Sequence, residues 1–272
     1  MSRWPKQWTA PADTAGFFAE VETGASLLML DYDGTLAPFT ANRLKAFPYD
    51  GVKERLETLL RIRSVRLVLV TGRPARELKD LAALSAAVEI WGSHGREHLL
   101  ADGSYTLEQV TGRQMQVLQE IAERLSRAGY GEALERKPAS LAVHWRTLDA
   151  AGQRTLQQLT IESFERSGAQ EQLKLLSFES GLEIRCGNVD KGDAISRTLA
   201  TAGTRTPAAY LGDDLTDEDA FKALRGRGLT ILVGEQVRES AAEYWLHPPE
   251  QLLAFLDAWI QHAPADAEER RP

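Results

Sequence analysis

Cysteine and long apolar runs are both scarce in this chain. Cys186 is the single cysteine among 272 residues, so no disulfide can form within the chain, which fits a reducing compartment. No stretch approaches the ~20 apolar residues that a membrane-spanning helix needs, and the N-terminal stretch contains no apolar leader segment. We therefore expect a cytoplasmic protein that does not contact a membrane.

Clusters of basic residues are missing as well. Lys and Arg number 32 against 39 Asp and Glu, which gives a formal net charge of −7. Because binding to a nucleic-acid backbone needs clustered Lys and Arg, we do not expect a nucleic-acid partner. With 43% hydrophobic and 26% charged residues, the chain can still bury a full core, as one large domain or two moderate ones.

Short apolar runs recur along the chain and alternate with helical patterns. Near-continuous apolar runs joined through helices are typical of a parallel sheet that is covered on both faces. Ligands of such sheets bind beyond the carboxyl ends of the strands, which predicts Asp31, Thr71 and Asp213 at one edge. The runs begin at Ser26, Val65, Ala87, Ala208 and Leu229.

The stretch from residue 107 to residue 186 has a different pattern. Leu118, Ile121 and Leu125 form a helical stripe, whereas "SLAVHWR" and "GLEIRC" alternate apolar and polar residues. Such alternation indicates a half-solvated antiparallel sheet backed by helices, which we interpret as a cap domain inserted into the parallel core. The expected division is a discontinuous α/β core at 1–106 and 187–262, an inserted α/β cap at 107–186 and a charged, disordered tail at 263–272.

Asp31 and Asp33 in "LDYDGT" stand at the end of the first apolar run with one residue between them. Side chains two residues apart at a strand end point the same way, so the two carboxylates converge and their repulsion demands a cation. Mg²⁺, which prefers carboxylate oxygens, meets this demand, and "GDDLTDED" at Gly212 supplies further acids. Taken singly, each aspartate is better explained as an N-cap or turn residue, but this explanation does not account for the set.

Four motifs follow one another in order: "DYDGT", "TGR", "DKGDA" and "GDDLTDED". Each is a weak signal alone. Together they describe a phosphoryl-transfer site with a nucleophile, a phosphate clamp, a neutralising cation and metal ligands. The set resembles the haloacid dehalogenase superfamily, which implies a Rossmann-like parallel core that carries an inserted cap.

The superfamily resemblance assigns a role to each motif. Asp31 attacks phosphorus to give an aspartyl phosphate, and Asp33 protonates the leaving oxygen and later deprotonates a water. Asp217 either ligates or orients metal-bound water, or simply favours a helix N-terminus. The implied catalytic residues are Asp31, Asp33, Thr71 and Lys191, the implied Mg²⁺ ligands are Asp31, Asp33, Asp213 and Asp214, and Gly72 and Arg73 are implied on the phosphate.

Three further segments, "GSHGREH", "LERKPASLAVHWR" and "GLEIRCGNVDKGDA", resemble the trehalose-6-phosphate phosphatase family. Departures are local, with Trp145 and Cys186 where the family pattern commonly has tyrosine and proline. Carboxylates that accept from sugar hydroxyls and cations that donate to them suit a disaccharide. His144 can equally be a satisfied sheet residue and receives no role. The implied substrate-binding residues are His94, Gly95, Glu135, Lys137, Arg146 and Glu183, followed by Arg185 and Glu97.

The family resemblance implies Mg²⁺-dependent hydrolysis of trehalose 6-phosphate to trehalose and phosphate, the last step of trehalose biosynthesis, by a monomer that pairs functionally with a trehalose-6-phosphate synthase. One alternative is a phosphatase for another sugar phosphate. Another, of a different class, is a non-catalytic regulatory module that binds phosphosugars. The presence of Asp31, Asp33, Lys191 and Asp213 counts against this second alternative, since mere binding does not need all four.

Overall fold

The computed structural model describes residues 4–40, 42–178, 181–187 and 189–264. Two compact units make up the chain. Unit 1 comprises Met1–Thr106 and Asp190–Pro272, and unit 2 comprises Leu107–Val189. Within the described ranges, no helix is both long enough and apolar enough to cross a bilayer.

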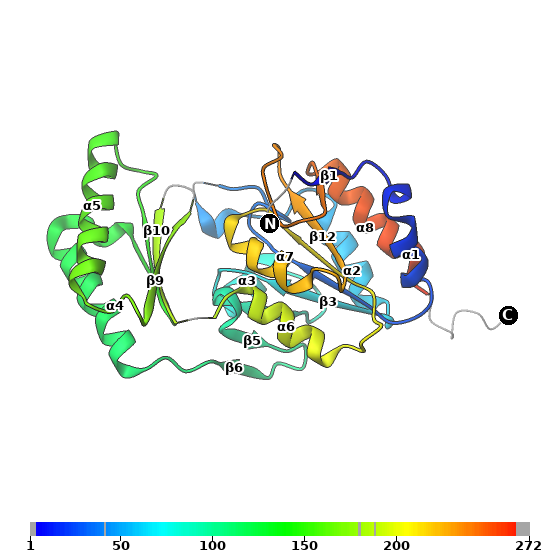
Figure 1. Ribbon diagram of the computed structural model, residues 1–272, viewed down its shortest axis with the longest axis horizontal. Coiled ribbons are helices and arrows are strands. Elements are labelled where there is room, and N and C mark those ends of the chain that lie inside the picture. Colours follow the sequence, from blue (N-terminus) through cyan, green and yellow to red (C-terminus); the bar gives the residue numbers. More distant parts are fainter. Residues whose placement is uncertain (1–3, 41, 179–180, 188, 265–272) are drawn as a thin grey trace. The chain divides into compact units, whose positions relative to one another are not determined.

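Unit 1 is built on a mixed, mainly parallel sheet (Figure 1). Neighbouring strands run parallel from β1 to β4, and β5 pairs antiparallel with β4. The α/β fold predicted from the apolar runs is confirmed. In sheet order the strands are β1 (Lys6–Gln7), β13 (Tyr244–Leu246), β12 (Leu229–Val233), β11 (Ala208–Gly212), β2 (Ser26–Leu30), β3 (Val65–Val70), β4 (Glu89–Gly92), β5 (Glu97–Leu99) and β6 (Tyr105–Leu107).

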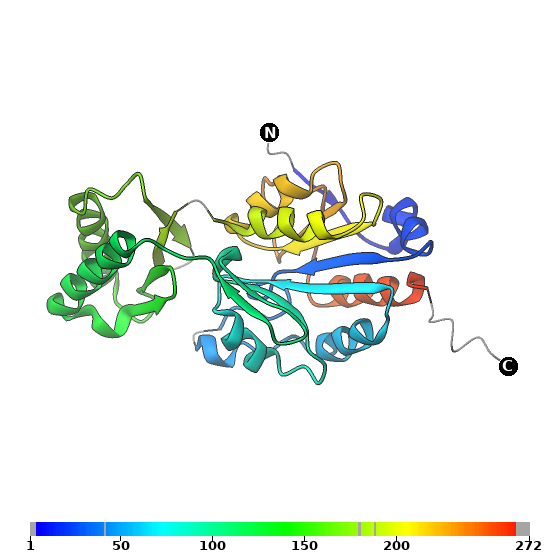
Figure 2. The same ribbon diagram turned by 90° about the horizontal axis from the view of Figure 1, so that it is seen from below.

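Helices cover both faces of this sheet, as Figure 2 shows for α6 on one side and α2 and α8 on the other. Two separate apolar clusters result, one on each face, and each contains side chains from the central strands. The helices are α1 (Ala15–Val21), α2 (Val52–Arg61), α3 (Ala75–Ala82), α6 (Lys191–Thr201), α7 (Glu218–Leu224) and α8 (Glu250–His262), and the short 3₁₀ turns are η1 (Pro11–Thr14), η2 (Arg43–Lys45), η3 (Ser93–Gly95) and η6 (Leu215–Asp217).

The central strands explain why the site forms where it does. All five residues of β2 and of β11 are buried, since both faces of these strands pack against helices. Leu30 of β2 pairs with Leu211 of β11 and with Leu69 of β3. The residues that follow these three strands therefore emerge side by side at one edge of the sheet.

Short edge strands were not predicted. β1, β5, β6 and β13 have only two or three residues each, too few for a period-2 pattern to be distinguished from a loop. The strand expected from Ala87 begins two residues later, at Glu89. At the other end of the chain, α8 reaches His262, and Ala263 caps it by donating its N–H to Trp259. The rest of the tail predicted to be disordered, from residue 265, lies outside the described residues.

Unit 2 holds a four-stranded antiparallel sheet in the order β7 (Leu134–Lys137), β8 (Ser140–His144), β10 (Gly181–Cys186) and β9 (Leu173–Phe178). Both long helices, α4 (Gly112–Leu125) and α5 (Ala150–Arg166), lie on the same side of this sheet in Figure 1. They pack against Leu141, Val143 and Ile184. The turns η4 (Ser126–Tyr130) and η5 (Gly131–Ala133) lead from α4 into β7. The predicted antiparallel sheet backed by two helices is confirmed.

The second face of the unit 2 sheet is polar. Strand register places side chains that point away from α4 and α5 in two adjacent rows. We call this surface the polar face of unit 2. It is made of Glu135 and Lys137 on β7, Ser140, Ala142 and His144 on β8, and Glu183 and Arg185 on β10.

Candidate active site

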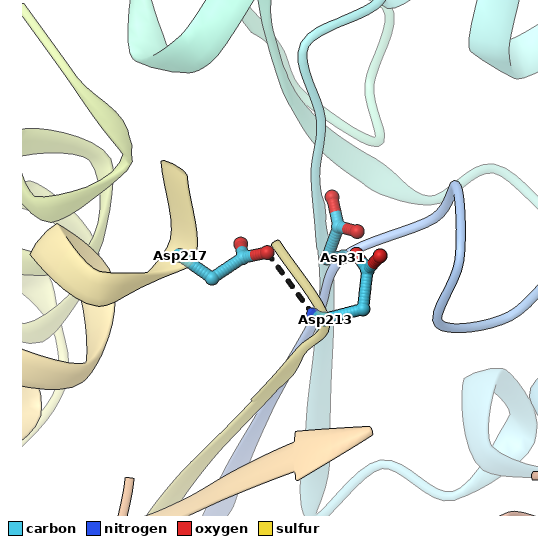
Figure 3. Close-up of side chains that lie close together, drawn as sticks. All are labelled: Asp31, Asp213 and Asp217. Atoms are coloured by element: carbon cyan, nitrogen blue, oxygen red, sulfur yellow. Dashed lines mark hydrogen bonds between the residues drawn. The ribbon is translucent and has the colours of Figure 1, made fainter. Parts of the chain in front are cut away.

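Three carboxylates converge at the carboxyl edge of the unit 1 sheet (Figure 3). Asp31 follows β2, Asp213 follows β11, and Asp217 ends η6. One oxygen from each lies within 4.8 Å of the others. The Asp213 N–H donates to Asp217 at 3.1 Å, the bond drawn in Figure 3. The sequence predicted that Asp31 and Asp213 lie together, and it left open whether Asp217 belongs to the metal site or only favours a helix N-terminus.

Among the described residues, Lys191 is the one cationic side chain that donates hydrogen bonds to the carboxylates of this cluster. Its Nζ donates to Oδ1 of Asp31 at 2.6 Å and to Oδ1 of Asp217 at 2.7 Å. It is the first residue of α6, whose start is fixed by the Asp190 side chain accepting from the N–H of Asp193. The lysine is 3% exposed, so its ammonium is held in place by these two carboxylates.

Burial and crowding raise the pKa of these acids. Burial raises the pKa of Asp31 to about 7, against the opposing effect of Lys191 and with a further push from Asp217. Burial and the charges of Asp31 and Asp217 raise the pKa of Asp213 well above its usual range. Lys191 is affected in the opposite direction, since burial alone lowers its pKa but Asp217 and Asp31 outweigh burial and raise it. One lysine is therefore too little positive charge for three carboxylates, of which Asp31 and Asp217 are buried and Asp213 is half-buried.

The donor set fits a hard divalent cation. Oδ1 of Asp213 is buried and accepts no hydrogen bond from any described residue. A buried carboxylate oxygen without a donor costs free energy unless a cation or water supplies one. Oxygen ligands and an excess of negative charge favour Mg²⁺ over softer metals. Asp31 and Asp213 are the residues best placed to hold it.

Asp33 does not join the cluster through its carboxylate. Arg73 holds it in a two-point ion pair, with Nε donating to Oδ2 and Nη2 donating to Oδ1, both at 2.6 Å. Arg73 also donates to Glu77 of α3 at 2.9 Å. The guanidinium that we expected on the phosphate is thus bonded to two carboxylates of the protein.

Asp214 acts as a helix cap. Its Oδ1 accepts from the N–H of Leu215 at 2.6 Å, and it forms a capping box with Asp217 at the start of η6. Asp217 rather than Asp214 belongs to the carboxylate cluster. Asp217 is fully buried and accepts from Lys191, from the hydroxyl of Tyr210 and from the N–H of Asp214. The explanation of Asp217 as a purely helix-favouring residue therefore covers only part of its contacts.

Thr71 follows the neighbouring strand β3 and is fully buried. Its Oγ1 accepts from the N–H of Arg73 at 3.1 Å, so the turn at "TGR" is tight. A side chain at Gly72 would meet the ring of His94, because a Cβ there would lie 2.6 Å from Cε1. The turn after β3 therefore packs against η3, and the backbone N–H of His94 donates to the carbonyl of Thr71.

Gly95 and Glu97 stabilise the turn that follows β4. Gly95 has a φ of +99°, and a Cβ there would lie 2.7 Å from the carbonyl oxygen of Asp190. Glu97 is 2% exposed and accepts from the N–H of Ala75, from the hydroxyl of Tyr105 at 3.0 Å and from the hydroxyl of Ser93. All these partners belong to the protein, so the geometry of Glu97 suits holding the turn rather than meeting a substrate.

The polar face of unit 2 brings three of the residues expected from the sequence, Glu135, Lys137 and Glu183, into one network. Lys137 Nζ lies 3.1 Å from Glu183 Oε1 and 3.9 Å from Glu135 Oε1. Ser140 donates to the same Glu183 oxygen at 2.6 Å, and His144 Nε2 lies 2.9 Å from Glu135 Oε2. His144 is therefore a partner of Glu135, which favours its interpretation as a satisfied sheet residue.

Arg185 and Arg146 differ sharply in their surroundings. Arg185 is 4% exposed, and its Nε and Nη1 find no hydrogen-bond acceptor among the described residues. Arg146 lies in the exposed turn after β8 ends at His144, so it does not continue the strand face as the alternation predicted. Of the two, only Arg185 shares the polar face with Glu183.

Sequence reasoning missed Tyr210 and Thr35. Tyr210 is fully buried in β11 and donates to Asp217, while Thr35 donates to Oδ2 of Asp31 at 3.3 Å. Burial raises the pKa of Tyr210 well above its usual value, and Asp217 and Asp31 add to the effect, so it stays a donor. A signal existed for Tyr210, because a tyrosine inside a buried strand needs a partner for its hydroxyl.

The sequence of this chain is similar to those of known trehalose phosphatases. The family profile described as trehalose-phosphatase matches residues 29–247. A probable trehalose-phosphate phosphatase C of Arabidopsis thaliana is 28% identical over 258 residues, covering 86% of this chain and 77% of that protein.

Two solved structures share the architecture. The C-terminal domain of a C. albicans trehalose-6-phosphate phosphatase has a TM-score of 0.77 at 20% identity over 96% of this chain and 99% of its own, a likeness of fold. A trehalose-6-phosphate phosphatase related protein has a TM-score of 0.70 at 27% identity over 87% and 97%. Since the profile spans most of the sequence, this chain belongs to the trehalose-phosphatase family.

Proposed function

We propose that this protein is a Mg²⁺-dependent phosphatase that hydrolyses trehalose 6-phosphate to trehalose and phosphate. The observation that carries the proposal is the buried contact of Asp31 with Lys191 beside the carboxylate of Asp213. A carboxylate held against a lysine can act as a nucleophile toward phosphorus, because the lysine neutralises charge there. Membership of the trehalose-phosphatase family supports the choice of ester.

In the first half-reaction a carboxylate oxygen of Asp31 attacks phosphorus and the bond from phosphorus to the sugar oxygen breaks. Asp33 gives its proton to the departing sugar oxygen, so trehalose leaves as a neutral alcohol. Lys191 and the hydroxyl of Thr71 bind the phosphoryl oxygens, where the ammonium neutralises the charge that builds and the hydroxyl donates a hydrogen bond to it. The product on the protein is an aspartyl phosphate at Asp31.

In the second half-reaction a water attacks the aspartyl phosphate. Asp33, now ionised, takes a proton from this water, and the bond from phosphorus to the Asp31 oxygen breaks. Inorganic phosphate leaves, and both aspartates return to their starting protonation states. Two easier steps replace a single hydrolysis whose uncatalysed rate is among the slowest known, with accelerations up to ~10²¹-fold.

Asp31 and Asp213 would hold the metal, with Asp217 close by. When bound, Mg²⁺ supplies a Lewis acid that neutralises charge on the phosphoryl oxygens. The protein contributes the fixed frame for it. Tyr210, Lys191 and two backbone N–H groups lock Asp217 in place, so the cluster is ordered by hydrogen bonds of its own.

We assign sugar recognition to the polar face of unit 2. Glu135, Lys137 and Glu183 already form one network there, and carboxylates and an ammonium suit hydroxyl groups of a disaccharide. Arg185 adds two buried nitrogens, Nε and Nη1, from which no described residue accepts a hydrogen bond. We treat the two units as separate domains, a catalytic core and a cap. The cytoplasmic location, the monomeric state and a functional pairing with a trehalose-6-phosphate synthase stay predictions.

The proposal is tested by phosphate release from trehalose 6-phosphate, glucose 6-phosphate and sucrose 6-phosphate, each with Mg²⁺ and with a chelator. We expect turnover of trehalose 6-phosphate to exceed that of the other two and to vanish with the chelator. Metal-dependent release from another ester would keep the catalytic aspartates and overturn the assignment of the sugar. No release from any ester would favour a phosphosugar-binding regulatory module.

A further inference from the structure

Asp33 begins a row of four charged side chains of alternating sign. Arg73 binds both oxygens of Asp33 at 2.6 Å, Glu77 accepts from Arg73 at 2.9 Å, and Arg43 donates to the other oxygen of Glu77 at 2.8 Å. The four residues come from the loop after β2, the turn after β3, the first turn of α3, and η2. Segments distant in sequence thus fix one carboxylate.

Exposure differs along this row. The Arg73 side chain is 7% exposed, whereas that of Asp33 is 29% exposed. The guanidinium therefore lies behind the carboxylate, and the carboxylate meets the open edge of the site. Arg73 is also fixed through its main chain, since its N–H donates to Thr71 and its carbonyl accepts from Ser93.

The donors of Arg73 are largely used within the protein. A guanidinium has five N–H groups in a rigid fork, and three of these donate to Asp33 and Glu77. Its two-point contact matches the geometry of a carboxylate, which a lysine cannot reproduce. An arginine that clamped the phosphate directly would have to give up these bonds.

We propose that Arg73 is a positioning residue for Asp33 and that Glu77 is its rear anchor. This inference rests on the proposed function, because it assigns Arg73 to the proton-transfer group of that reaction. The fork holds the Asp33 carboxylate in one orientation, and each of its oxygens keeps another lone pair that faces away from the guanidinium. Proton exchange with the sugar oxygen, and later with water, takes place at such a lone pair.

A consequence separates positioning from substrate binding. An alcohol such as a sugar leaves poorly without a proton, whereas p-nitrophenolate is a stable anion that leaves without one. Misplacing Asp33 therefore slows hydrolysis of the sugar ester far more than that of p-nitrophenyl phosphate. Removing a phosphate ligand would slow both esters alike and raise the KM of both, since they share the phosphate group.

The experiment measures kcat and KM for trehalose 6-phosphate and p-nitrophenyl phosphate in Arg73→Gln, Arg73→Lys and Glu77→Gln. For Arg73→Gln we expect kcat on the sugar ester to fall ~10²-fold, kcat on the aryl ester to fall about threefold or less, and KM values to stay within about twofold. Arg73→Lys should recover part of the loss. Glu77→Gln should show the same split at smaller size, and it keeps the test valid if the Arg73 variants do not fold.

Arg66→Gln is the matched control. Arg66 also lies on β3 and makes a two-point pair, with Glu89 at 2.9 Å for both contacts, but it lies near the start of the strand, away from Thr71. Its kcat ratio between the two esters should equal that of the wild type. Equal losses on both esters in Arg73→Gln, or a KM increase that accounts for the loss, would overturn the inference alone. A wild type without phosphatase activity would overturn the proposed function, and the inference with it.

Discussion

The carboxyl edge of unit 1 and the polar face of unit 2 both hold carboxylates beside a lysine, but they differ in how far positive charge matches the negative charge. At the edge of unit 1, three carboxylates share Lys191, which is 3% exposed. On the polar face, the charges of Glu135 and Glu183 are matched by those of Lys137 and Arg185, and Lys137 Nζ lies 3.1 Å from Glu183 Oε1 and 3.9 Å from Glu135 Oε1. One region carries an unmet negative charge and the other is nearly neutralised.

This difference separates chemistry from recognition. Burial, and then the charge of neighbouring carboxylates, raises the pKa of Asp31 and of Asp213. A bound cation would relieve this excess of negative charge. A network whose charges balance needs no added cation and can exchange its internal bonds for those of sugar hydroxyls. Changes at the edge of unit 1 should therefore abolish turnover, whereas changes on the polar face should affect affinity for the sugar.

The largest expected effect comes from Asp31→Asn. Loss of the attacking carboxylate should lower kcat on every ester by ~10⁴-fold or more, because a nucleophile acts as one unit with its partners. Phosphate release in saturating Mg²⁺ measures the loss, and circular dichroism checks the fold. Asp80→Asn, at an exposed aspartate of α3, is the control and should keep full activity. Substantial turnover by Asp31→Asn would refute the nucleophile assignment.

Glu183→Gln tests the role of the polar face of unit 2 in recognising the sugar. Loss of one charged hydrogen-bond acceptor should lower kcat/KM for trehalose 6-phosphate about 10- to 100-fold, mainly through KM, and leave p-nitrophenyl phosphate nearly unchanged. Steady-state kinetics on both esters provide the measurement. Glu171→Gln, at an exposed glutamate of the same unit, should match the wild type. Parallel losses on the two esters would mean that the polar face does not recognise the sugar.

Metal binding should stabilise unit 1 by relieving its unmet charge. Mg²⁺ at about 100 times its Kd should raise the free energy of unfolding by ~3 kcal/mol, which corresponds to a Tm increase of roughly 5 °C or more. Differential scanning fluorimetry with and without Mg²⁺ measures the shift. Asp213→Asn should lose it, and Asp80→Asn should retain it. Retention of the full shift in Asp213→Asn would place the ion elsewhere.

The smallest expected effect concerns a carboxylate outside both regions. Burial alone would raise the pKa of Glu89, but bonds from His98 and Arg66 outweigh it and lower the pKa. A depressed pKa stabilises the fold above the usual value of 4.5, and this contribution is lost as the pH falls through the folded-state value.

Arg66→Gln should therefore cost about 1 kcal/mol at neutral pH, since the arginine is partly exposed, and less in acid. Urea unfolding at pH 7 and about pH 4 measures the difference between wild type and variant at each pH. A cost that did not shrink in acid would show that packing of the Arg66 stem, rather than its charge, stabilises this part of unit 1.

Much of the fold was predictable because the central strands are apolar throughout. The runs at Ser26, Val65, Ala208 and Leu229 became β2, β3, β11 and β12 with the same first residues. The short edge strands were not predictable, because two or three residues give no periodicity and their pairing is set by neighbours distant in sequence. The placement of Arg146 on the strand face was wrong for a related reason, since β8 ends two residues before it.

The sequence by itself determined which chemical groups stand at the ends of the buried strands, because strand periodicity and turn residues are local properties. It thus indicated Asp31, Thr71 and Asp213 at one edge of the sheet, and the order of the motifs added Lys191. Only the tertiary structure decided which of the neighbouring polar side chains contact one another. Asp217 rather than Asp214 enters the cluster because the η6 turn rotates one inward and makes the other a cap. Arg73 binds Asp33 because three separate segments meet there, and such long-range contacts leave no periodic trace in a sequence.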